Sequence, residues 1–245
     1  MRLKCDFISK EIPSTYNLMF VSLIKQALKE SDEDYFQKIY FFDGKANKKS
    51  KDFCFSVQLK SHDFEENIAK LKEGGSFVVS SPNKEFIIHL YNGLLKIEDF
   101  KYKGFSLKRG KMSLVKDKLG KIDSNEMLFA TMSPFCVKRK DGYYMKLEDE
   151  GFQEELNYIA GLVLENYRGF GLAKEIEFQE VKMRKVVVRE EINGFEEMTK
   201  KKYMYVNSYE GVFKLCGDER DLKDLYELGL GFRRNQGFGM MDVVY

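Results

Sequence analysis

Residues 218–245 read DERDLKDLYELGLGFRRNQGFGMMDVVY, and this stretch predicts a short helix, a glycine-rich loop and a strand, in that order. A dinucleotide-binding fingerprint needs a strand before its glycines and a helix after them, so that the helix N-terminus meets the pyrophosphate. A P-loop would end in Gly-Lys-Ser/Thr, and this loop does not. The sequence therefore argues against both kinds of nucleotide-binding loop.

A helix C-cap explains only part of this loop. Gly229 directly follows DLYEL, at the position where a residue with left-handed backbone commonly ends a helix. Such a cap accounts for one or two glycines, but not for four glycines around the polar segment 233–236. The loop is therefore either a binding element or a tight architectural turn, and the residues alone leave both open.

The rest of the second half shows strand and helix patterns. Residues 126–138 and 142–147 are expected to be strands joined by a Lys-Asp-Gly turn, and residues 176–190 and 202–215 are expected to form a long hairpin. Between them, one apolar stripe at helical spacing predicts a helix, and it consists of Phe152, Leu156, Ile159 and Val163.

The first half repeats the same order of elements. Strands are expected at 2–8, 52–59, 76–81 and 99–107, with one helix after Ser14 and a second over 83–95. Two successive βαββαβ units predict an α+β fold with two tandem ferredoxin-like domains. The expected boundaries are 1–107 for the first domain, 108–125 for a basic linker and 126–245 for the second domain.

The composition is that of a globular protein. Of the 245 residues, 43% are hydrophobic and 33% are charged, and no apolar run approaches the roughly 20 residues that span a bilayer. The N-terminus is charged where a signal peptide would be apolar, so a cytoplasmic location without a membrane partner is expected. The four cysteines are far apart and are expected to be structural thiols rather than disulfides or zinc ligands: Cys5, Cys54, Cys136 and Cys216.

The distribution of charge is more informative than the net charge of +2. Residues 101–121 hold seven lysines and one arginine against one aspartate, a local surplus of seven. A second cluster lies between Lys45 and Lys51, and Arg233 with Arg234 forms a third. Each cluster alone is as well explained by a solvated surface as by a binding site. Three clusters with 14 tyrosines and 21 phenylalanines make RNA a reasonable partner.

The segment LGLGFRRNQGFGMMDVV near the C-terminus resembles the glycine-rich signature of the RAMP proteins of CRISPR systems, and most of all that of their repeat-processing endoribonuclease family. Residues 205–232 resemble that family's strand, glycine-aspartate turn and helix before the loop. FATMSPFCVK (129–138) resembles the strand that opens its second domain, and KSKDFCFSVQL (49–59) resembles its strand after the first helix. The resemblance covers most of the chain.

This resemblance implies two ferredoxin-like domains and a reaction. Family members cut precursor CRISPR RNA within each repeat without a metal or other cofactor: a ribose 2′-hydroxyl attacks the adjacent phosphate and leaves a 2′,3′-cyclic phosphate and a 5′-hydroxyl. They commonly use a tyrosine on the first helix, a histidine after it and a lysine before the second strand. Aligned through LIKQALK and KDFCFS, these positions hold Lys25, Tyr40 and Lys51, so only the lysine is retained.

The family's histidine is thus absent from its expected position. His89 is expected to be a satisfied, partly buried imidazole and His62 a surface residue. Two explanations stay open: the protein cuts through orientation and lysine charge, with Tyr40 or a lysine moving protons, or it binds repeat RNA without cutting. A shifted alignment would make Tyr35 the relevant tyrosine.

The predicted RNA-binding residues fall into three groups. They are the loop residues Gly229, Gly231, Arg233, Arg234, Asn235, Gln236, Gly237 and Gly239, the lysines Lys48 and Lys49, and the strand residues Lys182, Arg184, Lys185 and Arg189. The strand residues are expected to present one edge or one face of the strand to an RNA stem. Besides repeat RNA, the resemblance suggests CRISPR effector-complex subunits and a second copy of the chain as partners. An endoribonuclease, a non-catalytic RNA-binding subunit and a protein with a purely architectural loop are the three hypotheses.

Overall fold

The computed structural model describes residues 1–47, 49–116, 118–192 and 194–244. By its internal contacts the chain divides into two units. Unit 1 comprises residues 1–51, 57–115 and 189–204, and unit 2 comprises residues 52–56, 116–188 and 205–245. The β12–β13 hairpin contributes to both units, because its strands β12 (Glu177–Glu190) and β13 (Met204–Cys216) begin or end in unit 1.

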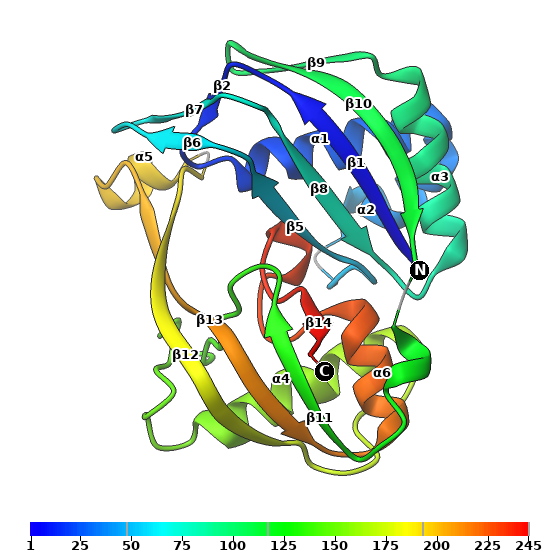
Figure 1. The fold of residues 1–245 in the computed structure, drawn as a ribbon, viewed down its shortest axis with the longest axis vertical. Helices are drawn as coiled ribbons and strands as arrows, with labels where there is room; N and C mark the ends of the chain where they lie inside the picture. The colour runs from blue at the N-terminus through cyan, green and yellow to red at the C-terminus, as the bar shows by residue number, and fades with distance from the viewer. Residues whose placement is uncertain (48, 117, 193, 245) are drawn as a thin grey trace. The chain divides into compact units, whose positions relative to one another are not determined.

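Unit 1 is built on a five-stranded sheet in the order β5-β8-β1-β10-β9 (Figure 1). The strands are β1 (Arg2–Ile8), β5 (Cys54–Leu59), β8 (Gly75–Ser80), β9 (Asp99–Tyr102) and β10 (Phe105–Val115). Strand β1 pairs antiparallel with both β8 and β10. With α1 after β1 and α3 after β8, this order is the fourth-first-third-second arrangement of a ferredoxin-like βαββαβ unit.

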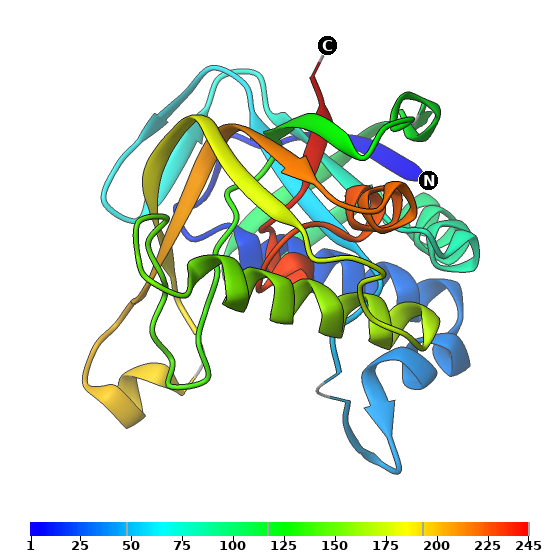
Figure 2. The same cartoon turned by 90° about the horizontal axis from the view of Figure 1, so that it is seen from below.

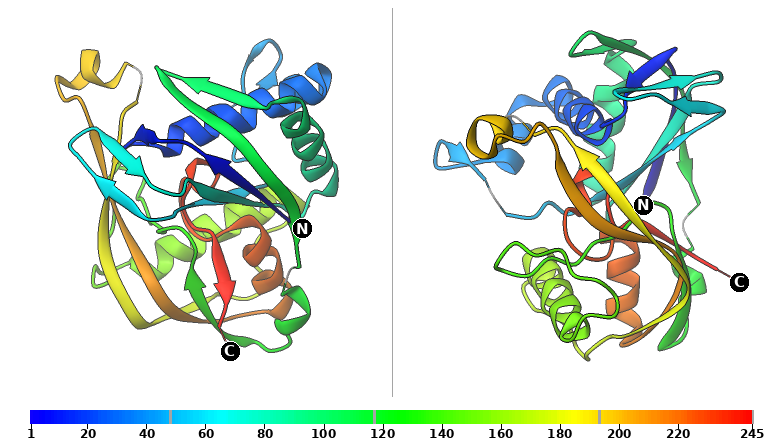
Figure 3. Two further views of the ribbon diagram at one scale, coloured as in Figure 1. Left: turned by 45° about the horizontal axis from the view of Figure 1, so that its top comes forward. Right: turned by 90° about the vertical axis from the view of Figure 1, so that its left-hand side faces the viewer.

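Helices α1 (Asn17–Ser31) and α3 (Lys84–Lys96) pack side by side on one face of this sheet (Figure 3). Helix α1 corresponds to the helix expected after Ser14, and it buries one apolar stripe, because side chains three and four residues apart share a helix face. Its buried members are Met19, Phe20, Leu23, Ile24, Ala27 and Leu28.

Smaller elements surround this core. Helix α2 (Glu33–Tyr40) follows α1, and a hairpin of β3 (Phe41–Phe42) and β4 (Lys45–Ala46) follows α2. In Figure 2 this hairpin, drawn in light blue, extends away from α1 and α2. A separate three-stranded sheet has the order β2-β7-β6, from β2 (Glu11–Pro13), β7 (Ile68–Leu71) and β6 (His62–Phe64).

Unit 2 repeats the arrangement with a four-stranded sheet in the order β12-β13-β11-β14. Strand β11 (Glu126–Thr131) precedes helix α4 (Phe152–Arg168), and helix α6 (Glu219–Leu228) precedes β14 (Met241–Val243). The fold is therefore α+β with two ferredoxin-like units, as the sequence predicts. Three short helices complete the chain: η1 (Leu119–Lys121), α5 (Phe195–Thr199) and η2 (Arg234–Gln236).

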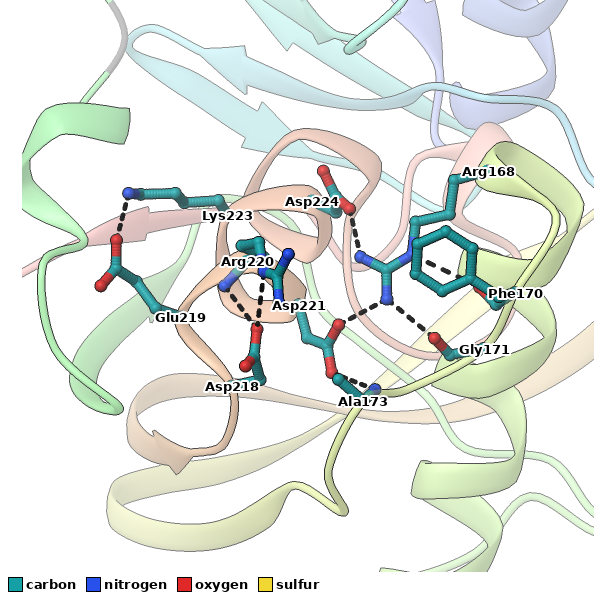
Figure 4. A network of polar contacts seen from close by, with 10 residues as sticks. All are labelled: Arg168, Phe170, Gly171, Ala173, Asp218, Glu219, Arg220, Asp221, Lys223 and Asp224. Atoms are coloured by element: carbon teal, nitrogen blue, oxygen red, sulfur yellow. Dashed lines mark hydrogen bonds and ion pairs between the residues drawn. The ribbon is translucent and has the colours of Figure 1, made fainter.

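A buried ion-pair network fixes α6, the helix that leads into the glycine-rich loop (Figure 4). Arg168 at the end of α4 donates to Asp224 at 2.6 Å and to Asp221 at 2.5 Å. Asp221 is fully buried and also accepts the backbone N–H of Ala173 at 2.7 Å. Because each charge has a partner, the network ties α4, the loop after it and α6 together without leaving a buried charge unpaired.

Some sequence predictions about elements are wrong. The single strand expected at 99–107 is the pair β9 and β10, joined by a turn at Lys103 and Gly104, both with positive φ. The basic stretch expected to be a linker from residue 108 is strand up to Val115, because β10 continues its pairing with β1. Residues 142–147 do not form a strand; the segment meets residues 126–138 at the isolated bridge between Lys138 and Tyr144, where Met145 donates its N–H to the carbonyl of Val137 at 2.9 Å. None of the helices within the described residues is long and apolar enough to cross a membrane.

The cysteines are free thiols, as expected. Cys5, Cys54 and Cys136 are buried, and Cys216 is half-buried. Burial raises the pKa of the Cys5 thiol to about 12, so this thiol stays protonated and unreactive at neutral pH.

Candidate active site

Three residues that the sequence selects from separate segments converge in unit 1. The Nζ atom of Lys25 lies 5.0 Å from the centroid of the Tyr40 ring, and that of Lys51 lies 5.6 Å from the same centroid. Lys25 comes from the exposed side of α1, Tyr40 ends α2, and Lys51 precedes β5. Two ammonium groups around one tyrosine ring form a positively charged site, here called the Tyr40 cluster.

Helix α2 sets the position of Tyr40. The side chain of Asp32 accepts the backbone N–H of Tyr35 at 2.8 Å, which caps the start of the helix. The chain then reverses at Asp43 and Gly44, both with positive φ, as a two-residue hairpin turn requires. This turn brings residues 47–51 back beside α2.

Asn47 closes this segment against α2. Its backbone N–H donates to the carbonyl of Tyr40 at 2.7 Å, and its side-chain Nδ2 donates to the carbonyl of Ile39 at 3.2 Å. The Nζ atom of Lys51 donates to the carbonyls of Asn47 and Lys49, each at 2.9 Å. Lys51 is 8% exposed, so its ammonium is held in one place rather than moving in solvent.

Burial raises the pKa of the Tyr40 phenol well above its ordinary value. A phenol with a raised pKa stays protonated at neutral pH and is a hydrogen-bond donor rather than a general base. The sequence leaves open that Tyr40 moves protons during cutting. A phenol that stays protonated does not fit the role of general base.

Neither histidine belongs to the cluster. The His89 ring stacks on Tyr35 with centroids 4.0 Å apart, and its Nδ1 lies 3.1 Å from the Ser31 hydroxyl. The partly buried, hydrogen-bonded imidazole expected for His89 is thus confirmed. The Tyr35 ring packs against this imidazole and does not belong to the Tyr40 cluster. His62 is exposed on β6 beside Phe64.

The glycine-rich loop of unit 2 is a tight turn in which all four glycines have positive φ. A Cβ atom on Gly239 would lie 2.0 Å from the carbonyl oxygen of Leu230, and one on Gly231 would lie 2.5 Å from that of Cys136. Leu230 donates its N–H to Gly239 at 2.8 Å, and Gly239 donates its own to Pro134 at 2.9 Å. A backbone with positive φ therefore explains all four glycines of the loop, including Gly229 and Gly237. A helix cap would explain only one or two of them.

The two arginines of the loop have different surroundings. Arg234 is 3% exposed and donates to the carbonyl of Leu228, and burial lowers its pKa to about 10. This burial does not agree with the predicted contact between Arg234 and RNA; the side chain holds the end of α6 instead. Arg233 is half-buried, and its Nη1 lies 3.3 Å from the hydroxyl of Tyr144. Asn235 and Gln236 are half-buried in η2.

The basic residues of β12 do not share one face. Side chains alternate along a strand, so Lys182 and Arg184 lie on one face and Lys185 on the other. Arg184 is paired with Glu210. Arg189 belongs to unit 1, where it donates to the Ser14 hydroxyl at 2.6 Å. These residues therefore do not form a single basic face, whereas β12 does lie at the edge of its sheet, the other arrangement expected from the sequence.

The remaining predicted residues and one missed element lie near the Tyr40 cluster. Lys49 is exposed, and Lys48 lies outside the described residues. The β3–β4 hairpin is not among the predicted strands, although FFDGKA (41–46) carries the Asp-Gly signal of a two-residue turn. In the described part of the chain, no three His, Cys, Asp or Glu side chains are placed to hold a metal ion.

Comparison with known proteins identifies similar chains. Residues 115–243 match the family model of the C-terminal part of CRISPR-associated protein Cas6. The CRISPR-associated endoribonuclease Cas6 1 of Methanocaldococcus jannaschii is 26% identical over 241 residues, which cover 94% of this chain and 86% of that one.

Solved structures share the fold over the whole chain. A Cas6-related protein from Pyrococcus furiosus is 21% identical, with a TM-score of 0.81 over 100% of this chain and 98% of its own. A RAMP protein that binds different RNA substrates is 20% identical, with a TM-score of 0.81 over 100% of both chains.

Proposed function

The chain belongs to the Cas6 family of CRISPR-associated proteins, and from this premise we propose that it is an endoribonuclease that cuts precursor CRISPR RNA within the repeat. The curated relative that matches 94% of the chain is named as an endoribonuclease. The observation that carries the proposal is the Tyr40 cluster, in which Lys25 and Lys51 lie at 5.0 Å and 5.6 Å from one tyrosine ring.

The proposed reaction is a transesterification that uses the RNA's own nucleophile. The bond from the 2′-oxygen to phosphorus forms while the bond from phosphorus to the 5′-oxygen breaks, which leaves a 2′,3′-cyclic phosphate and a 5′-hydroxyl. Lys25 and Lys51 stabilise the charge that builds up on the phosphoryl oxygens. Tyr40, protonated because of its burial, donates a hydrogen bond to the same group. The 2′-hydroxyl proton passes to solvent, and solvent returns one to the 5′-oxygen.

A second function is favoured by a specific observation. Within the described residues, neither histidine belongs to the Tyr40 cluster, and His89 is held by Ser31 and Tyr35. Histidine is the side chain best suited to moving protons near neutral pH. A protein without it at the cut site is also suited to binding repeat RNA without cutting, as a subunit of an effector complex.

One experiment separates the two functions. The protein is incubated with its cognate repeat RNA in EDTA, beside the same RNA with a 2′-deoxy nucleotide at the cut site. The endoribonuclease is expected to cut the first RNA and to bind both equally, because the deoxy substitution removes only the nucleophile. Equal binding without any product supports the non-catalytic subunit, and absence of binding at low salt contradicts both.

A further inference from the structure

The β3–β4 hairpin, which directly follows Tyr40, has two unlike faces. Its strands pair Phe41 with Ala46 and Phe42 with Lys45. Residues directly opposite each other in an antiparallel pair point to the same face, and neighbours along a strand point to opposite faces. One face therefore carries Phe41 and Ala46, and the other, here called the outer hairpin face, carries Phe42 and Lys45.

The face that carries Phe41 and Ala46 packs against helix α2. The ring centroids of Phe41 and Phe36 are 6.0 Å apart in an edge-to-face arrangement, and those of Phe36 and Tyr40 are 5.1 Å apart. These contacts seat the hairpin on α2. Phe41 is accordingly 38% exposed, whereas Phe42 is 78% exposed. A ring this exposed contributes little to folding and remains available for contact with a ligand.

The charge around Phe42 indicates which partner. Residues 36–51 contain five lysines and one aspartate, a surplus of four positive charges. Lys45 and Lys49 are exposed. An apolar ring beside an ammonium group on one face suits a ligand that has a flat π-system next to an anion. A nucleotide of single-stranded RNA is such a ligand, since its base stacks on aromatic rings and its phosphate pairs with lysine.

We propose that the outer hairpin face binds one unpaired nucleotide of the RNA beside the cut site, with the base on Phe42 and a phosphate on Lys45. The hairpin begins directly after Tyr40, so the nucleotide on its outer face would belong to the RNA strand that reaches the Tyr40 cluster. This inference rests on the proposed RNA function and adds a site that orients the strand for cutting.

The chain has no tryptophan, so Phe42→Trp creates a single fluorescent reporter at the site. The probe is the cognate repeat RNA with a 2′-deoxy nucleotide at the cut position. Stacking of a base is expected to quench the Trp emission with the same dissociation constant as direct binding. Phe64→Trp, at a position on β6 that is 57% exposed, is the matched control and is expected to show no quenching. Unchanged emission from Phe42→Trp at saturating RNA overturns the proposal.

Affinity measurements with graded substitutions test the same site independently. Base stacking contributes about 1–3 kcal/mol, so Phe42→Ala is expected to weaken binding by about 5- to 150-fold. Phe42→Tyr is expected to bind RNA like the wild type, because it keeps an aromatic ring. Phe42→Leu keeps apolar area without a π-face and is expected to bind as weakly as Phe42→Ala. If Phe42→Ala binds and cuts like the wild type, the proposal fails while the endoribonuclease stands. If the wild type binds no repeat RNA, the function itself fails.

Discussion

Lys51 and Tyr40 are joined through one residue: Lys51 donates its ammonium hydrogen to the carbonyl of Asn47, and Asn47 donates its N–H to the carbonyl of Tyr40. The same ammonium lies 5.6 Å from the Tyr40 ring centroid. A lysine and a tyrosine that are 11 positions apart in the sequence are thereby held as one unit, with a charge fixed beside a protonated phenol. The predictions below follow from this arrangement and from the loop of unit 2.

Lys51→Ala is expected to slow RNA cutting by about 10²-fold, because it removes a fixed positive charge from the transition state. Affinity for the uncut repeat is expected to change little. Single-turnover cleavage and equilibrium binding on the same preparation measure both. Lys38→Ala, which removes an exposed lysine of α2, is the matched control and is expected to cut at the wild-type rate. An unchanged rate for Lys51→Ala would remove this residue from the active site.

Tyr40 is expected to make stability depend on pH at the alkaline end. Burial raises its pKa, so the folded state favours the protonated phenol. The resulting stabilisation is complete below the unfolded-state pKa of about 10 and is lost as the pH rises through the folded-state value. Denaturant unfolding at a series of alkaline pH values is expected to show a steeper loss for the wild type than for Tyr40→Phe. Parallel curves would show that folding does not desolvate the Tyr40 phenol.

The pH dependence of cutting by Tyr40→Phe distinguishes a hydrogen-bond donor from a general base at this position. If the phenol only donates a hydrogen bond, the substitution lowers the cleavage rate by a constant factor between about pH 6 and 9, because the phenol does not titrate there. The pH–rate profiles of the wild type and Tyr40→Phe are then parallel. A profile whose shape changes on substitution would instead assign the proton transfer to Tyr40.

The adjacent arginines of the glycine-rich loop are expected to differ in what they affect. Arg234→Ala leaves the buried carbonyl of Leu228 without its donor and should lower the free energy of unfolding by about 1–3 kcal/mol. Arg233 has φ of 61°, so Arg233→Asn removes the charge while keeping a residue that tolerates this backbone. It should leave unfolding nearly unchanged and weaken RNA binding with a shallower salt dependence. Equal effects of both substitutions on the free energy of unfolding would contradict a structural role for Arg234 and an RNA-binding role for Arg233.

Gly239→Ala tests whether the loop's glycines are required by backbone geometry. The new Cβ would lie 2.0 Å from the carbonyl oxygen of Leu230, at φ of 72°. The free energy of unfolding is expected to fall by about 3 kcal/mol. Gly161→Ala in α4 is the control: its Cβ meets nothing within 4 Å, and it should raise stability by about 0.5–1 kcal/mol. A neutral Gly239→Ala would show that the loop can relax.

The sequence was sufficient for elements with a strong periodic signal. The apolar stripe of α4 and the long β12–β13 hairpin were predicted, because burial of one face leaves a repeat that can be read directly. Lys25, Tyr40 and Lys51 were selected through family resemblance rather than spacing, and the structure brings the two lysines to within 5.0 Å and 5.6 Å of the Tyr40 ring centroid.

What the sequence missed depends on irregular backbone. Arg233 and Arg234 are the same residue type in adjacent positions, so the sequence does not reveal that Arg234 is buried while Arg233, with positive φ, is half-buried. Tyr144 lies in an alternating segment, yet a single bridge to Lys138 replaces the expected strand. Alternation indicates a half-buried surface, but the ladder of hydrogen bonds depends on neighbours distant in sequence.

The most direct test of the central claim is the chemistry of the RNA ends. A transcript with two cognate repeats is incubated with the protein in EDTA, and its fragments are analysed by mass spectrometry. The proposed reaction predicts one cut per repeat at a fixed position, with a 2′,3′-cyclic phosphate on one fragment and a 5′-hydroxyl on the other. Fragments with a 5′-phosphate and a 3′-hydroxyl, or cutting that requires a divalent metal ion, would contradict it.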